Sequence, residues 1–149
     1  MSIMIVRGPA SHDRLIRGPE PLPREILGLL VARAADAGKT AALRACGCEQ
    51  ELLDALRVAE RARVELVVID PGTCADSPRL QTLLASLGCP HIQVRTGQGN
   101  SPAAVSPATF GRCIASVHGY GAQSYVLALS IALEHLGCES VRERYHVGT

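Results

Sequence analysis

The sequence predicts an α/β fold in which helices cover both faces of a parallel β-sheet. Short apolar runs rich in Val, Ile and Leu alternate with longer stretches whose apolar residues recur at helical spacing. Gly and Pro mark most of the boundaries between the two kinds of segment. This alternation is typical of βαβ units, and 149 residues suit a single domain, 1–149, with its own hydrophobic core.

Five short runs are expected to form the strands. The clearest is 64–69, a mostly apolar run that stops at Asp70-Pro71-Gly72, and the weakest is 40–45, whose apolar side chains are mostly small. The expected strands are residues 3–6, 40–45, 64–69, 91–95 and 112–117.

Four longer stretches are expected to form helices. Gly38 and Gly137 follow the first and the last, and Pro78 begins the third, with Asp76 or Ser77 as its N-cap. The expected helices are residues 23–37, 49–63, 78–87 and 122–136. This order suits a flavodoxin-like, doubly wound, five-stranded parallel sheet with helices on both faces. Such folds bind ligands beyond the carboxyl ends of their strands, here in the loops 7–23, 70–77, 96–107 and 118–122.

The composition argues against nucleic acids and membranes as partners. The chain has 15 basic and 14 acidic residues, a formal charge of +1 and no Trp, so it lacks the basic surface that nucleic-acid binding requires. No apolar run reaches the ~18 residues that span a bilayer. The first residues show no basic segment or small-residue cleavage site, so we expect a cytoplasmic protein.

The six cysteines do not predict a disulfide framework or a metal site. Only Cys46 and Cys48 lie close together, and neither Cys-x2-Cys pairs nor histidines at ligand spacing accompany them. We therefore interpret the cysteines as small apolar fillers in a reducing compartment. The Gly119-x-Gly121 pair precedes the last helix and lacks the third Gly of a nucleotide loop, where Ser124 stands. We expect no metal and no cofactor.

Five motifs are spread over most of the chain. They are IVRGP at 5–9, Arg17 with Pro19, EQELLD at 49–54, VVIDPG at 67–72 and GYGAQSYVLAL at 119–129. Their order and spacing resemble the type II 3-dehydroquinate dehydratases, small flavodoxin-like enzymes of the shikimate and quinate pathways. In that family the first strand ends in Asn-Gly-Pro, and the strand before the central loop ends in Asn-Pro-Gly.

The sequence differs at the positions where the resemblance places the reacting groups. The family's Tyr base falls at Leu22, although the Arg that assists it is kept as Arg17. An Asn that helps to stabilise the enolate falls at His12. The substrate-binding Asn before Pro-Gly is Asp70, and the His of the loop that follows is Asp76.

A second stretch of the resemblance also departs from the family pattern. The family's His-x-Ser-Asn-x-His motif reads RTGQGN over residues 95–100. The resemblance thus implies substrate contacts from Arg95, Gly97 and Gln98, with Asn100 in place of the His that protonates the leaving hydroxyl. Arg112 replaces a missing loop Arg only if the local register shifts.

These replacements predict little or no dehydration of 3-dehydroquinate. A hydrocarbon cannot accept a proton and an amide does not give one at neutral pH, and each lost acid or base lowers the rate by roughly 10²–10⁴-fold. A rebuilt catalytic set would consist of His12, Arg17, Asp70 and Asp76, with Leu22, Gly97, Gln98, Asn100 and Arg95 binding substrate. Structural alternatives stay open: a turn residue for Asp70, a helix cap for Asp76, an ion-pair partner for Arg95, and a solvated loop for His12 and Arg17.

Three functions remain open. The first is a cofactor-free lyase, isomerase or cyclase acting on a small molecule of secondary metabolism through an enolate-like or alkoxide intermediate. The second is an inactive binding or scaffold homologue, and the third is 3-dehydroquinate dehydratase itself. Convergence of the candidate residues favours the first, whereas scattering or mutual pairing favours the second.

The resemblance also implies a homo-oligomer, a dodecamer built as a tetramer of trimers. The scarcity of charge between Ala122 and Gly137 agrees with buried contacts between subunits.

Overall fold

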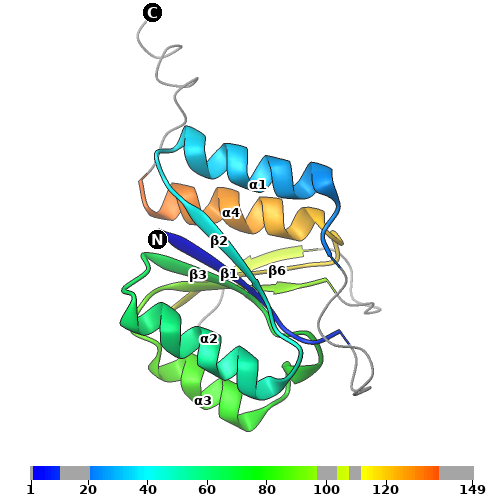
Figure 1. The fold of residues 1–149 in the computed structure, drawn as a ribbon, viewed down its shortest axis with the longest axis vertical. Coiled ribbons are helices and arrows are strands. Elements are labelled where there is room, and N and C mark those ends of the chain that lie inside the picture. The colour runs from blue at the N-terminus through cyan, green and yellow to red at the C-terminus, as the bar shows by residue number, and fades with distance from the viewer. Residues whose placement is uncertain (1, 11–20, 97–103, 108–111, 138–149) are drawn as a thin grey trace, which may run out of the picture.

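The computed structural model describes residues 2–10, 21–96, 104–107 and 112–137. Within them a six-stranded sheet, in the order β2-β1-β3-β4-β6-β5, is covered by helices on both faces (Figure 1). The strands are β1 (Ile3–Arg7), β2 (Ala41–Ala45), β3 (Leu66–Asp70), β4 (His91–Arg95), β5 (Ala104–Pro107) and β6 (Cys113–His118). The helices are α1 (Arg24–Asp36), α2 (Glu49–Arg61), α3 (Pro78–Ser86) and α4 (Gln123–His135), with a single 3₁₀ turn at Gly72–Cys74.

Strands β2, β1, β3, β4 and β6 are parallel to one another, which confirms the predicted doubly wound α/β fold. The expectation for 104–107 was wrong, because this part of the predicted loop forms β5, antiparallel to β6 at the edge of the sheet. The segment AVSP carries no long apolar run, and it ends in Pro107. Proline is tolerated on an edge strand, where its missing N–H leaves no ladder bond unmade.

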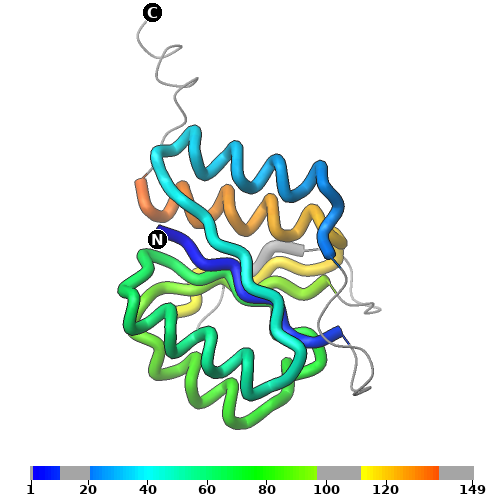
Figure 2. Tube along the Cα trace, viewed as in Figure 1, coloured from blue at the N-terminus to red at the C-terminus, as the bar shows by residue number. Residues whose placement is uncertain are grey.

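Two apolar layers hold the helices to the sheet. Helices α1 and α4 pack on one face, and α2 and α3 on the other, as the tube in Figure 2 also shows. Both faces of β1 and β3 are covered, so every side chain of these two strands is buried. This explains why they are continuous apolar runs rather than alternating ones.

The turns after β1 and β3 lie against each other. The Gly8 N–H donates to the Asp70 carbonyl at 2.6 Å, and the Thr73 N–H donates to the Pro9 carbonyl at 2.9 Å. A Cβ atom on Gly8 would collide with the Pro71 carbonyl, and one on Gly72 with the Pro9 carbonyl. Both glycines are therefore required for the close approach that brings the carboxyl ends of β1 and β3 together.

The third helix begins as predicted. Ser77 is its N-cap and accepts a hydrogen bond from the Leu80 N–H at 3.3 Å, and Pro78 occupies the first turn. Of the two cap candidates, Ser77 rather than Asp76 fills the role. In the part of the chain that the structure describes, no helix combines the length and the apolar character needed to cross a membrane.

Candidate functional site

A buried hydrogen-bond network occupies the carboxyl edge of the sheet. Asp70 ends β3 and lies in register with Arg7, which ends β1. The Asp70 Oδ2 accepts hydrogen bonds from the Tyr125 hydroxyl and from the Thr96 hydroxyl, both at 2.6 Å, and Oδ1 accepts one from the Gly72 N–H at 3.1 Å. The Tyr125 hydroxyl in turn accepts a hydrogen bond from the Arg7 Nε at 3.0 Å.

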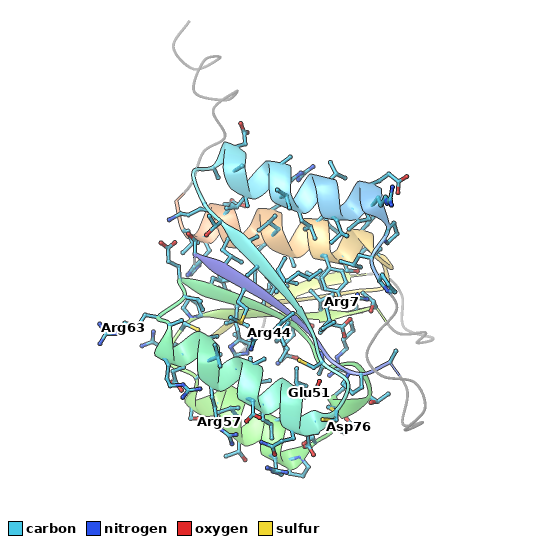
Figure 3. The ribbon with its side chains drawn as sticks, viewed as in Figure 1. Arg7, Arg44, Glu51, Arg57, Arg63 and Asp76 are labelled. Atoms are coloured by element: carbon cyan, nitrogen blue, oxygen red, sulfur yellow. The ribbon has the colours of Figure 1, made fainter. Side chains whose placement is uncertain are left out.

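Sequence segments far apart supply this network because the fold gathers strand ends at one edge. Arg7 ends β1, Asp70 ends β3 and Thr96 directly follows β4. Tyr125 lies in the first turn of α4. All four side chains lie on the face that α4 covers, and Figure 3 shows Arg7 between the sheet and α4. Arg7 and Asp70 are 8% and 7% exposed, and Tyr125 is fully buried. The network is thus largely removed from solvent.

In this network the Asp70 carboxylate is a hydrogen-bond acceptor whose position is fixed by its donors. The Arg7 guanidinium carbon lies 5.3 Å from the centre of the Tyr125 ring, a cation–π distance. Burial, followed by the Asp70 carboxylate, raises the pKa of Tyr125, so the phenol keeps its proton and is no base at neutral pH. Tyr125 therefore donates to Asp70, and Asp70 is the acceptor on which the network converges.

Asp76 does not join this network. It is exposed in the turn between the 3₁₀ segment and α3. Figure 3 shows it on the side of the sheet that α2 and α3 cover, away from Arg7. No hydrogen bond or ion pair of Asp76 is found among the described residues. The two carboxylates of the 70–77 loop therefore lie in different environments: Asp70 is buried in the network and Asp76 is exposed.

Two further candidates lie in contrasting environments. Leu22 is 7% exposed and packs with Ile26 and Leu30 in the apolar layer between the sheet and α1. Arg95 ends β4, is exposed, and lies in register with His118 of β6. The candidates His12, Arg17, Gly97, Gln98 and Asn100 lie outside the described residues.

Sequence reasoning missed three members of the network: Arg7, Thr96 and Tyr125. Arg7 carried a usable signal, because a charged residue directly after four residues of a buried strand must find a buried partner. The register that pairs Arg7 with Asp70 and brings Tyr125 to both is a long-range property. It could be seen only once the strand order was known.

Four of the five described cysteines are at least partly buried and form no reactive centre of their own. Burial is the main cause that raises the pKa of Cys46, to about 11, and it also raises the pKa values of Cys74, Cys89 and Cys113. These side chains are therefore thiols at neutral pH and poor nucleophiles or metal ligands. No group of three or more His, Cys, Asp or Glu residues suited to a metal ion is found among the described residues.

This arrangement defines a class of protein: a doubly wound α/β domain whose polar groups gather where such folds bind their ligands. No family model matches the chain. The chain is 30% identical over 142 residues to a 3-dehydroquinate dehydratase of Teredinibacter turnerae, covering 91% of this chain and 92% of that protein. The chain belongs to the type II dehydroquinase family.

Solved structures show the same fold. A type II dehydroquinase from Butyrivibrio crossotus matches with a TM-score of 0.65 at 17% identity, over 88% of this chain and 96% of that one. One from Propionibacterium acnes matches with a TM-score of 0.62 at 20% identity, over 88% and 94%. A 3-dehydroquinate dehydratase-like protein from Bifidobacterium longum matches with a TM-score of 0.56 at 19% identity, over 92% and 99%.

Proposed function

We propose that this family member binds a small molecule at the carboxyl edge of its sheet and acts on it as a cofactor-free lyase, isomerase or cyclase. We further propose that it has little or no 3-dehydroquinate dehydratase activity. The observation that carries the second statement is Leu22. At the position of the family's Tyr base stands a hydrocarbon, packed with Ile26 and Leu30 in the core.

The network at the strand ends supports a change of chemistry rather than a repaired dehydratase. Asp70 stands where the resemblance places an amide, and the hydrogen bonds that its carboxylate makes with the described residues all come from donors. Tyr125 keeps its proton, so it does not substitute for the missing base. A reaction at this edge would therefore use groups other than the family's acid and base, with His12 and Arg17 as the candidates for proton transfer and charge stabilisation.

Purified protein supplied with 3-dehydroquinate tests the proposal. We expect no rise in enone absorbance above background, and turnover within tenfold of an ordinary family member would overturn it. The double variant Leu22→Tyr with Asn100→His restores the two missing side-chain types and serves as a gain-of-activity comparison. Native mass spectrometry of the wild type, followed by incubation of any released molecule with fresh protein, then tests for conversion.

The family's own reaction is a second candidate, and the 30% identity to a 3-dehydroquinate dehydratase over 142 residues favours it. The same absorbance assay decides between the two. A third candidate is an inactive binding homologue. It is favoured by the engagement of both Asp70 oxygens within the protein and by the separation of Asp76. A ligand that co-purifies but returns unchanged after incubation would support it.

We also propose a cytoplasmic, dodecameric protein of secondary metabolism. The scarcity of charge on α4 does not support the assembly, because its apolar side chains pack against the sheet and α1 within one subunit. Support comes instead from α1, where Val31 and Leu29 are 63% and 40% exposed. Light scattering should give a multiple of the 15.7 kDa chain mass, and a monomer at micromolar concentration would refute the assembly.

A further inference from the structure

We infer that Cys48 and Cys74 form a redox modification site, at which a small-molecule disulfide such as oxidised glutathione converts the two thiols into one intramolecular disulfide. This bond joins the turn between β2 and α2 to the turn between β3 and α3. Both residues are free thiols in the structure, and both reach solvent. The inference is independent of the reaction that the protein performs, because it concerns these two thiols and not the substrate.

Side-chain contacts hold the two turns together. The Ser77 hydroxyl at the start of α3 donates a hydrogen bond to the Glu49 carboxylate at the start of α2. A second hydrogen bond, 3.3 Å long, runs from the Arg79 guanidinium to the side-chain oxygen of Gln50. Figure 1 shows α2 and α3 on the same face of the sheet, where they share one apolar layer. The first turns of the two helices are therefore fixed against each other.

The two cysteines belong to these connected turns. Cys48 is the N-cap of α2 and directly precedes Glu49, and its side chain makes no capping hydrogen bond. Cys74 ends the 3₁₀ turn, its carbonyl accepts a hydrogen bond from the Ser77 N–H at 3.0 Å, and its side chain packs on the shared apolar layer. Burial and then Glu49 raise the pKa of Cys74, and the Cys48 thiolate adds to this effect. The two sulfur atoms thus lie within electrostatic reach of each other.

Burial and position exclude the other described cysteines as partners. Cys46 is only 2% exposed, and its backbone N–H donates to the Arg7 carbonyl at 2.8 Å. An oxidant in solution therefore reaches Cys48 and not Cys46. Cys89 precedes β4 and Cys113 begins β6, so both lie at the amino edge of the sheet, opposite the turns that carry the proposed pair.

The exchange balances in two steps. The Cys48 thiolate attacks one sulfur of oxidised glutathione, which forms a mixed disulfide and releases one glutathione thiolate. The Cys74 thiol then loses its proton to solvent and attacks the Cys48 sulfur, which forms the protein disulfide and releases the second glutathione. The two cysteines lose two electrons, and the glutathione disulfide gains them. Because the pKa of Cys74 is raised, little of it is thiolate at neutral pH, and the second step accelerates as the pH rises.

Peptide mapping after oxidation tests the inference. The full-length protein is incubated with oxidised glutathione, its remaining thiols are alkylated, and it is digested with trypsin. The digestion places Cys74 in the peptide 64–79. It places Cys48 in the peptide 45–57, together with Cys46. We expect a disulfide-linked pair of these peptides from a chain that runs as a monomer on a non-reducing denaturing gel, and dithiothreitol should separate the pair.

Variants and fragment spectra identify the two sulfur atoms. Cys48→Ser and Cys74→Ser should each lower the yield of the linked pair at least tenfold, whereas Cys46→Ala should leave it unchanged. Cys113→Ser, at the opposite edge of the sheet, is the matched control and should also leave the yield unchanged. Fragment ions of the linked wild-type peptides locate the bond without any variant. Absence of the linked pair, a bond at Cys46, or a yield that Cys48→Ser leaves unchanged would overturn the inference.

Discussion

Removing one charge from the buried network should cost far more stability than removing both. In Arg7→Asn, the Asp70 carboxylate remains buried without its cation, and the Tyr125 oxygen loses its charged donor. In Asp70→Asn, Arg7 keeps its hydrogen bond to Tyr125 but loses the carboxylate at the other end of the hydrogen-bond chain. The double variant Arg7→Asn with Asp70→Asn restores two neutral amides, the residue type that the resemblance places at both strand ends.

The expected magnitudes follow from burial. The Tyr125 hydroxyl links Arg7 to Asp70. Removing one of two buried opposite charges in direct contact typically costs about 3–5 kcal/mol, whereas replacing both is often nearly neutral, so the lower end of that range applies to a linked pair. Arg7 and Asp70 are 8% and 7% exposed, so little solvent screens either charge. Each single variant should therefore lose about 3 kcal/mol of unfolding free energy. The lost packing of the Arg7 side chain is common to the single and double variants and cancels in the cycle. The coupling energy should be at least about 2 kcal/mol.

Urea denaturation at one fixed protein concentration gives the four unfolding free energies. The matched control is the surface pair Arg57–Asp54, whose nitrogen and oxygen lie 3.2 Å apart and whose side chains are 49% and 57% exposed. Its Asn/Asn cycle should give a coupling energy below about 0.5 kcal/mol. If the Arg7 and Asp70 losses are additive to within that same amount, the two charges act independently and the reasoning is refuted.

Three further measurements probe other parts of the chain. Leu22→Ala should destabilise the fold by about 2–5 kcal/mol in urea, because Leu22 is a core side chain, and a loss below about 1 kcal/mol would contradict that placement. Burial lowers the pKa of His91 from 6.5 to about 4. Between these two pH values His91 is protonated in the unfolded chain and neutral in the native state. Stability should therefore fall by up to about 3 kcal/mol between pH 6.5 and pH 4, relative to His91→Gln; parallel pH profiles would disprove it. Arg17→Ala should lower ligand affinity or turnover at least tenfold, about 1.4 kcal/mol, with little change in Tm; unfolding with spared function would mean that Arg17 is structural.

Local patterns predicted most of the fold because each parallel strand is buried and each helix has punctuated ends. Residues 64–69 read as a strand because both faces of β3 are covered, and Ser77-Pro78 marked the start of α3. β5 was missed because an edge strand of four residues needs no apolar pattern of its own. It is specified by its pairing with β6, which no local window contains.

The site was less predictable because it depends on register. The turn Asp70-Pro71-Gly72 could be placed at a strand end from sequence, which made Asp70 a candidate. That its partners are Thr96 and Tyr125 follows from strand order and from the position of α4, not from spacing along the chain. Leu22 could not be placed from local sequence either. It lies in a Pro-rich segment and was a candidate for substrate binding, and the structure packs its side chain in the core.

The register of β1 and β3 explains how a charged pair can stand at this edge. In the family pattern that the sequence resembles, both strands end in Asn. Here they end in Arg7 and Asp70, which are direct neighbours in the sheet. Both side chains are buried and are joined through the Tyr125 hydroxyl, so a change at one alters the surroundings of the other. Together they give Tyr125 a cation on one side and an anion on the other. The two changes therefore depend on each other physically.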